Sequence, residues 1–572
     1  MSVKISTKRN KRNFVSENFI PDTWEHIEPY YQELIKTELV DVQTFRNWLR
    51  NRSELESIIS EDAGWRYIRM TCDTAKKEYQ EAYTYFVSEI EPKIAPLNHK
   101  LNEKVINCPF KNDIQDDAFK ILFKNIEKDF KIFREENIPL KTEIQNNAKE
   151  YGNISGAMTV NIDGKEMTLQ QAATILESTD RPRREEAYRK ISERRFKDRD
   201  KLDELFNKLI SLRDRVARNA DFENFRDYMF TAMGRFDYTP QDCFDFHESA
   251  QKEIVPILNQ LAKERKEKLN LPQLRPWDKA VDATGKPPLV PFKDTKDLVD
   301  KTILCFNRLD PFLGQCINTM RKINHLDLDS RVGKAPGGYN YPLSEIGIPF
   351  IFMNATSTLR DLVTILHEGG HAVHSIVTKD LELADFKHTP SEVAELASMS
   401  MELISMDHWD IFFDNKEELK RAKKEHLEQI IQTLPWVAVI DKFQHWIYEN
   451  PSHSIEERKI TWNAILSDFS DTTTDWAGLE HYRDYTWQRQ LHLYEVPFYY
   501  IEYGFAQLGA IAVWKNFKEN PKKGLDGYLS ALKLGYTRSI PDIYRAANIE
   551  FNFSREYISD LIAFVREELD KV

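Results

Sequence analysis

The feature that most constrains this chain is the pentapeptide His367-Glu368-Gly369-Gly370-His371, a single H-E-x-x-H motif. On a helix, two histidines four residues apart lie on one face, one turn above the other. Their imidazoles can then bind one metal ion, while Glu368 projects close by and can take a proton from water that the metal activates. The alternative is a surface helix with two ordinary histidines, and the surrounding residues argue against it.

The flanking residues predict that the motif lies on a helix. Ser357 and Thr358 offer hydroxyl caps, and Asp361 places an acid in the first turn. Apolar residues then recur at helical period: Leu362, Ile365, Leu366, Ala372, Val373 and Ile376. Gly369 and Gly370 are poor helix formers that cost about 1 kcal/mol each against alanine. We therefore expect close packing there, either against a neighbouring helix or against a substrate.

A catalytic zinc needs three protein ligands and one open position, so a third ligand must come from elsewhere. The segment T-P-S-E-V-A-E-L-A-S offers Glu392 and Glu395. Thr389 and Glu392 form a predicted capping box with Pro390 at the first helical position, which gives Glu392 a structural task. Glu395 lies one turn further on among apolar residues, where an acid is rarely buried without a partner. We expect Glu395 to be the third ligand and Glu392 to be the alternative.

A further acid on the same predicted helix is a candidate partner of a ligand histidine. Glu402 follows Glu395 by seven residues and shares its helical face. It is placed to hold a ligand histidine through a hydrogen bond. The alternative for Glu402 is a solvated surface acid.

These segments resemble the zinc oligopeptidases of the thimet oligopeptidase and oligoendopeptidase F family. The resemblance rests on H-E-G-G-H-A-V-H at 367–374 and P-S-E-V-A-E-L-A-S at 390–398. Three further segments, at 157–165, 233–240 and 497–503, also resemble the family, and the resemblance covers the chain well from about residue 150 onward.

The resemblance implies a mainly α, zincin-type helical metallopeptidase with a deep substrate channel and a small β-sheet near the active site. It implies one Zn²⁺ per chain, bound by His367, His371 and Glu395, with Glu368 as the general base. It also implies that the channel admits short unfolded oligopeptides and excludes folded proteins. The residues alone do not distinguish zinc from cobalt or manganese.

A tyrosine-rich segment late in the chain is the predicted source of oxyanion donors. Peptide hydrolysis creates an oxyanion, and the site needs hydrogen-bond donors directed at it. In the resembled family a histidine and tyrosines fill this role, and here His492 is followed by Tyr499, Tyr500 and Tyr503. We expect Tyr500 and Tyr503, which share a helical face, to donate to the oxyanion or the substrate carbonyl, and His492 to contact substrate. Tyr499 is an alternative donor, and tyrosines at this spacing are also typical of a core.

Two segments precede the predicted metal helix. Residues 337–342, G-G-Y-N-Y-P, are expected to form a flexible loop. Residues 348–355, I-P-F-I-F-M-N-A, are expected to form a strand. Such a strand can pair its backbone with an extended peptide, over which the loop could close. The alternative is a plain connecting loop and a buried strand.

Composition excludes several classes of protein. The chain has 572 residues, 41% of them hydrophobic and 30% charged, so it can bury a large core. A net charge of -12 disfavours a nucleic-acid-binding protein. No apolar run predicts a membrane span, and no secretory signal is visible. The five cysteines are scattered without paired spacing, which is typical of reduced thiols in a cytoplasmic protein. The sequence leaves the oligomeric state open.

The predicted organisation is an N-terminal helical domain with a β-hairpin over residues 1–195 and a metallopeptidase catalytic domain over residues 196–572. The hairpin spans residues 160–167 and turns at Asp163-Gly164. Thr168 then caps a helix. Residues 181–215 form a highly charged helical stretch, which we interpret as a solvated face.

Three other functions are compatible with parts of the sequence. A dipeptidyl carboxypeptidase of the angiotensin-converting type would need a cation to hold a substrate carboxylate, and Lys442, Arg483 and Arg489 are the candidates. A non-catalytic helical peptide-binding protein would usually have lost one member of the motif, and every member is intact. A carboxylate-rich di-metal bundle would need paired E-x-x-H motifs, and only one such cluster occurs.

Overall fold

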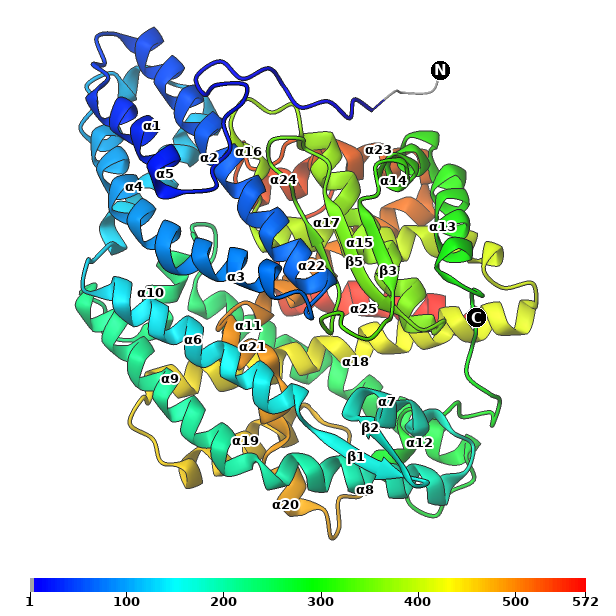
Figure 1. Ribbon diagram of the computed structural model, residues 1–572. Coiled ribbons are helices and arrows are strands. Elements are labelled where there is room, and N and C mark those ends of the chain that lie inside the picture. The colour runs from blue at the N-terminus through cyan, green and yellow to red at the C-terminus, as the bar shows by residue number, and fades with distance from the viewer. Residues whose placement is uncertain (1–4) are drawn as a thin grey trace. The chain divides into compact units, whose positions relative to one another are not determined.

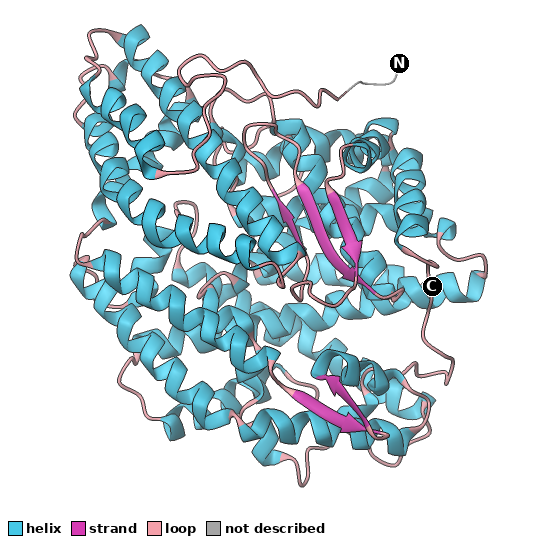
Figure 2. Cartoon of the chain, viewed as in Figure 1, coloured by secondary structure: helices cyan, strands magenta, loops and turns pink. Residues whose placement is uncertain are grey.

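The computed structural model describes residues 5–572, and helices dominate this part of the chain (Figures 1 and 2). The fold class predicted from the sequence, a mainly α protein with a small sheet, is confirmed. The described residues form two compact units, each built from three separate segments. The first unit comprises residues 5–133, 290–423 and 506–551, and the second comprises residues 134–289, 424–505 and 552–572. The predicted domain boundary after residue 195 stays a prediction.

The first unit holds the predicted metal ligands. Its N-terminal helices are α1 (Trp24–Lys36), α2 (Val42–Cys72), α3 (Lys77–Tyr85), η1 (Phe86–Ile90), α4 (Glu91–Ile106), η2 (Lys111–Asp113) and α5 (Asp117–Ile132). Its middle segment contains α13 (Thr295–Leu309), α14 (Pro311–Lys322), β3 (Leu326–Asp329), β4 (Tyr339–Tyr341), β5 (Phe350–Ala355), α15 (Leu359–Thr378), α16 (Ala384–Lys387), α17 (Ser391–Ser405) and η6 (Met406–Ile411). Its last segment adds α23 (Pro521–Leu532) and α24 (Ile540–Ala546).

The second unit holds the tyrosine-rich segment. Its first part contains α6 (Asn137–Gly156), β1 (Thr159–Ile162), β2 (Lys165–Thr168), α7 (Leu169–Thr174), η3 (Ile175–Glu177), α8 (Arg181–Lys197), α9 (Arg199–Asn219), α10 (Phe225–Ala232), α11 (Pro240–Ser249), η4 (Ala250–Ile254), α12 (Val255–Lys268) and η5 (Pro276–Asp278). Its later parts contain α19 (Ile455–Phe469), α20 (Glu480–Arg483), η7 (Thr486–Arg489), α21 (Leu491–Glu495) and α25 (Arg555–Asp570). Helices α18 (Lys416–Glu449) and α22 (Tyr500–Glu519) contribute residues to both units.

The first unit contains a three-stranded sheet in the order β3-β5-β4. Strand β5 runs parallel to β3, with Leu326 opposite Ile351, and antiparallel to β4, with Tyr339 opposite Phe352. The predicted strand at residues 348–355 is thereby confirmed as β5. The prediction of a flexible loop is wrong for Tyr339–Tyr341, which form β4. The Tyr339 ring stacks on Phe352 with centroids 4.8 Å apart, and its hydroxyl lies 2.6 Å from Thr71 Oγ1, so packing fixes this segment.

Helix α15, which carries the H-E-x-x-H motif, begins as the sequence predicts. Thr358 and Asp361 form a capping box: Asp361 N–H donates to Thr358 Oγ1 (3.2 Å), and Thr358 N–H donates to the Asp361 carboxylate (2.9 Å). The apolar stripe of the helix is buried. Figure 1 shows α15 and α17 beside the sheet, and their close approach has a local cause. A Cβ atom on Gly370 would lie 2.6 Å from Ser398 Cα, so only glycine lets the helices approach this closely.

Helix α17 begins one residue later than the sequence predicts. Pro390 is its N-cap rather than its first helical residue, and no side-chain capping bond forms. The predicted capping box of Thr389 and Glu392 is therefore wrong, because Thr389 precedes the cap position. Glu392 is nevertheless 3% exposed, and its backbone carbonyl accepts a hydrogen bond from Tyr544 Oη (3.1 Å).

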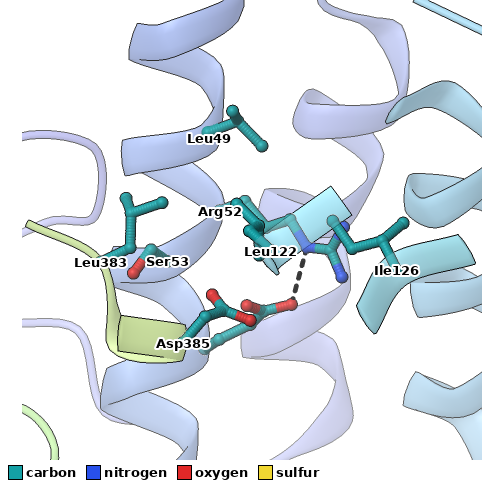
Figure 3. A pocket seen from close by; sticks show the side chains of 8 residues that line it. Leu49, Arg52, Ser53, Leu122, Ile126, Leu383 and Asp385 are labelled. Atoms are coloured by element: carbon teal, nitrogen blue, oxygen red, sulfur yellow. Dashed lines mark hydrogen bonds and ion pairs between the residues drawn. The ribbon is translucent and has the colours of Figure 1, made fainter. Parts of the chain in front are cut away.

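The connection between α15 and α17 is fastened to α2 through α16. The N–H of Ala384 donates to Ser53 Oγ (2.7 Å), and Arg52 on α2 pairs with Glu56 (2.8 Å). Figure 3 shows Asp385 of α16 beside Arg52, in a small cavity lined also by Leu122 and Ile126 of α5. Burial raises the pKa of both Glu56 and Asp385, although Arg52 opposes the shift. The hydrogen bond from Ala384 to Ser53 thus holds α16, in the connection between α15 and α17, against α2.

The predicted β-hairpin in the second unit is confirmed. Strand β1 pairs antiparallel with β2, from Thr159 opposite Thr168 to Ile162 opposite Lys165. Asp163 and Gly164 both have positive φ (54° and 74°), as a two-residue turn of this kind requires. Thr168 caps α7 in a capping box with Gln171, as expected.

The charged stretch at residues 181–215 is not simply a solvated face, so that interpretation is wrong in part. Arg184, Asp203 and Arg213 are at most 2% exposed. Each has a buried partner in the same unit: Arg184 pairs with Asp278 (2.9 Å), Asp203 pairs with Arg458 (3.0 Å), and Arg213 donates to Tyr448 Oη (2.7 Å). Charge density along a helix does not reveal which charges face inward.

None of the helices in residues 5–572 combines the length and the apolar character needed to cross a membrane.

Candidate active site

The predicted metal ligands come together in the first unit. His367 and His371 lie one turn apart on α15, with ring centroids 4.9 Å apart. Glu395 on α17 places Oε2 3.3 Å from His367 Nε2 and 3.7 Å from His371 Nε2. One ligand atom from each residue lies within 4.8 Å of the others, and Glu392 does not belong to this group.

The three ligand atoms fit a zinc ion. Zinc lies about 2.0–2.2 Å from nitrogen and oxygen ligands, so two ligands of a tetrahedral ion are about 3.3–3.5 Å apart. The separations of 3.3 and 3.7 Å between Glu395 Oε2 and the two histidine Nε2 atoms are close to that spacing. Two neutral imidazoles and one carboxylate also form a donor set that zinc accepts in catalytic sites, where three protein ligands leave one position for water.

Two further side chains contact the predicted ligands. His367 Nδ1 lies 2.6 Å from Glu402 Oε1, so the other ring nitrogen, Nε2, faces Glu395. Ser398 Oγ donates a hydrogen bond to Glu395 Oε2 (3.0 Å). Glu402 therefore contacts a predicted ligand histidine rather than being a freely solvated acid, and its contact is of the kind that holds metal-binding imidazoles in position.

The electrostatics of the group follow from burial and from the acids around it. Burial by itself would lower the pKa of His367, but the carboxylates of Glu395 and Glu402 raise it well above its ordinary value. Burial lowers the pKa of His371 to about 4. Burial raises the pKa of Glu368, which is 7% exposed, to about 7.

The predicted oxyanion donors gather in the second unit. The His492 ring centroid lies 4.9 Å from that of Tyr500 and 5.8 Å from that of Tyr503. Tyr499 belongs to the same group, with its centroid 5.2 Å from that of Tyr503. His492 Nδ1 lies 2.7 Å from Gln490 Nε2, which fixes the ring. All four rings of this group are only half-buried, so the tyrosines are not simply core residues.

A buried ion pair supports the tyrosine-rich segment. Phe498 has a positive φ of 68°, which is strained for a phenylalanine. Its N–H donates to Gln444 Oε1 (2.6 Å), and its carbonyl accepts from Arg235. Arg235 also pairs with Glu502 on α22 (3.0 Å), and both side chains are nearly inaccessible. These contacts fix the turn from which Tyr500 and Tyr503 project.

Sequence reasoning missed several of these supporting residues. Ser398 had a detectable signal, because it follows Glu395 by three residues on one helix. Asn340 donates a hydrogen bond from its side-chain amide to the backbone carbonyl of Glu368 (3.2 Å). No sequence pattern predicts this contact, because it joins two separate elements, β4 and α15. Gln444 and Arg235 likewise reach Phe498 across long sequence separations.

The candidate cations for a substrate carboxylate all lie in the second unit, and each has a partner there. Lys442 pairs loosely with Asp468 (3.6 Å). Arg483 donates to Ser467 Oγ (2.9 Å), and Arg489 packs over the ring of Trp436, 5.0 Å from its centroid. None of these contacts marks one of them as a carboxylate-binding residue.

Comparison with known proteins agrees with this geometry. The model of peptidase family M3 matches residues 174–284 and 313–561, and that of the peptidase M3 N-terminal domain matches residues 14–133. An oligoendopeptidase F homolog of Borreliella burgdorferi is 23% identical over 91% of this chain and 90% of its own length. The solved structure of Pz peptidase A with an inhibitor is 27% identical with a TM-score of 0.91, covering 98% of this chain and 99% of that one. A putative oligoendopeptidase F is 26% identical with a TM-score of 0.90 and the same coverage of both chains.

Proposed function

The chain belongs to peptidase family M3 and is a peptide-bond hydrolase, and from that premise we propose that it is a zinc-dependent endopeptidase of short unfolded oligopeptides. The observation that carries the proposal is the convergence of His367, His371 and Glu395 beside the buried Glu368. The relatives that bear the name oligoendopeptidase F support the oligopeptide as the substrate class.

The roles of the residues follow from their positions. A zinc ion held by His367, His371 and Glu395 would supply a Lewis acid to polarise the scissile carbonyl and make a water molecule more acidic. Glu368 accepts a proton from the attacking water as its oxygen bonds to the carbonyl carbon, and it donates that proton to the amine nitrogen as the C–N bond breaks. Glu402 accepts a hydrogen bond from His367 Nδ1–H, which keeps Nε2 directed at the ion. Ser398 holds Glu395 in place in the same way.

The tyrosine group supplies the remaining chemistry in this proposal. Tyr503 and Tyr500 donate hydrogen bonds to the developing oxyanion or to a substrate carbonyl, and His492 contacts the substrate. Their shared cluster and half-buried rings support this assignment.

An extended substrate would find a backbone partner in the sheet. Strand β4 pairs with β5 on one side and forms an edge of the described sheet. Asn340 of β4 is tied to the backbone of Glu368 on the metal helix. A peptide added to this edge would lie beside the general base, with Gly337 and Gly338 close to its path. We further propose that the substrate channel implied by the family resemblance admits only unfolded peptides.

The test is hydrolysis of a short quenched-fluorescent peptide whose two ends are both blocked. We expect cleavage within the peptide, complete loss of activity after treatment with a zinc chelator, and recovery when zinc is restored. A dipeptidyl carboxypeptidase would leave this blocked peptide intact and would cleave only a matching peptide whose C-terminus is free. Zinc binding without any cleavage would contradict the endopeptidase proposal and would favour a peptide-binding protein.

A further inference from the structure

Four side chains of types that can bind a metal ion lie close together in the second unit, and none of them belongs to the candidate site described above. Cys243 and His247 lie one turn apart on α11, and Asp441 and His445 lie one turn apart on α18. All four are at most 3% exposed. Two helices thus each present a pair of ligand-type residues spaced four apart, which is the spacing that lets one helix grip a single ion twice.

The atoms of three of these residues converge. A ligand atom from each of Cys243, Asp441 and His445 lies within 4.8 Å of the other two. His445 Nε2 is 3.2 Å from Asp441 Oδ2, yet neither ring nitrogen of His445 has a hydrogen-bond partner, and Asp441 Oδ1 also has none. Buried polar atoms without partners are rare and costly, so these atoms of His445 and Asp441 call for a further partner.

A hydrogen-bond network within the protein explains only one member of the group. His247 Nε2 lies 2.9 Å from Asp441 Oδ2 with hydrogen-bond geometry, and this contact accounts for His247. It does not account for the burial of His445. The His445 ring lies 3.2 Å from the same carboxylate, but this contact does not have hydrogen-bond geometry. Two ligands of one tetrahedral zinc lie about 3.3–3.5 Å apart without bonding each other, and the 3.2 Å between His445 Nε2 and Asp441 Oδ2 is close to that spacing.

We propose that Cys243, Asp441 and His445 bind a second divalent transition-metal ion, of which zinc is the best match, and that His247 orients Asp441. A thiolate and a carboxylate together neutralise the charge of a divalent ion, which removes the main obstacle to burying it. Thiolate, imidazole and carboxylate are all zinc ligands, and the thiolate excludes magnesium and calcium. His247 would donate to the carboxylate in the way that Glu402 contacts His367 in the first group.

The ion would have a structural role. It would join α11 to α18 within the buried part of the second unit, where the His445 ring packs against Phe244 and Phe498, with centroids 4.8 and 5.4 Å away. Gln444, the neighbour of His445, accepts the hydrogen bond from Phe498 N–H. The ion would therefore stiffen the support beneath the turn that carries Tyr500 and Tyr503.

Metal content of the purified protein tests this directly. We expect two equivalents of zinc per chain in the wild type and one in the double variant His367→Ala/His371→Ala, since that variant removes only the first group of ligands. Loss of all metal from the double variant would overturn the proposal. If the wild type binds one equivalent and the double variant retains it, the result contradicts the catalytic zinc and supports the second site. Failure of the proposed function and failure of this proposal are therefore distinguishable.

Cobalt supplies a readout that the first group of ligands cannot produce. Protein expressed with cobalt in place of zinc is expected to show a thiolate-to-metal charge-transfer band in the near ultraviolet, because only the second site contains a sulfur ligand. Cys243→Ser should abolish the band, while Cys316→Ser, which changes an equally buried cysteine outside any such group in residues 5–572, should retain it. A cobalt-loaded wild type without the band, or a band that survives Cys243→Ser, would overturn the proposal even if one variant failed to fold.

Discussion

His367 uses its two ring nitrogens for different tasks. Nδ1 lies 2.6 Å from Glu402 Oε1, and Nε2 faces Glu395 Oε2 at 3.3 Å. The Glu402 contact holds the ring so that Nε2 faces Glu395, and removing such a partner typically costs about 10- to 100-fold in metal affinity.

Glu402→Ala should therefore weaken zinc binding by about 10- to 100-fold while the protein still folds. Competition with a chromogenic chelator measures the change in Kd. Glu392→Gln is the matched control, since Glu392 is a buried acid on the same helix outside the ligand group. Equal zinc affinities for the wild type and Glu402→Ala would contradict the role of Glu402.

The ion pairs of Asp327 lead to a second prediction for a single residue, which concerns the stability of the fold at low pH. It accepts hydrogen bonds from Arg331 (2.6 Å) and from Lys334 (2.8 Å), whose side chain is inaccessible. Burial by itself would raise the pKa of Asp327, but these cations lower it to about 2, from an ordinary value of 3.8. A carboxyl group whose pKa is lower in the folded state stabilises the fold when the pH is above the pKa of the unfolded state. This stabilisation is lost as the pH falls through the pKa of the folded state.

Asp327→Asn should accordingly lower the free energy of unfolding by about 2 kcal/mol at neutral pH, from a shift of nearly two pKa units. The difference between wild type and variant should shrink between pH 4 and pH 2. Urea denaturation across that range measures it. A difference that stays constant down to the lowest pH would show that lost packing, rather than charge, causes the effect.

At the scale of elements, the geometry of the metal ligands depends on how closely α15 approaches α17. Gly370 sets that distance, because a Cβ atom there would lie 2.6 Å from Ser398 Cα and 2.7 Å from the Ala397 carbonyl. Backbone atoms cannot move aside as the end of a side chain can. The helices would have to separate, and Glu395 would move away from both histidines.

Gly370→Ala should therefore destabilise the protein and weaken zinc binding, although alanine is the better helix former. Gly152→Ala is the matched control: Gly152 lies within α6, and its Cβ would meet nothing within 4 Å. That control should gain up to about 1 kcal/mol from helix propensity. Thermal unfolding and zinc titration of both variants decide the matter, and a Gly370→Ala protein with normal zinc affinity would contradict the packing argument.

The helices and strands also show which parts of the fold local sequence patterns can predict. The start of α15, strand β5 and the hairpin turn at Asp163-Gly164 were predictable, because each is encoded by residues close together in the chain. The start of α17 was misplaced by one residue, since Thr389 and Glu392 have the spacing of a capping box but Pro390 occupies the cap. Strand β4 was missed because its order comes from Thr71 and Phe352, which lie far away in sequence.

At the scale of the whole molecule, the limits of prediction have the same origin. The two compact units each combine three separate segments, and no local pattern indicates which segments pack together. The candidate metal group was predictable, because the two histidines share helix α15 and Glu395 follows within thirty residues on α17. The buried ion pair of Arg235 and Glu502 was not predictable, because nothing in the sequence distinguishes these two residues from charged residues on the surface.

The central claim is that Glu368 is the general base of a zinc peptidase, and one paired measurement tests it most directly. Hydrolysis of a quenched-fluorescent peptide is followed for wild type and Glu368→Gln, with zinc quantified in both proteins. Glutamine keeps the size of the side chain but cannot accept the proton, so we expect unchanged zinc content and a loss of several orders of magnitude in kcat/KM. A variant that retains its zinc and cleaves at a rate near that of the wild type would contradict the account.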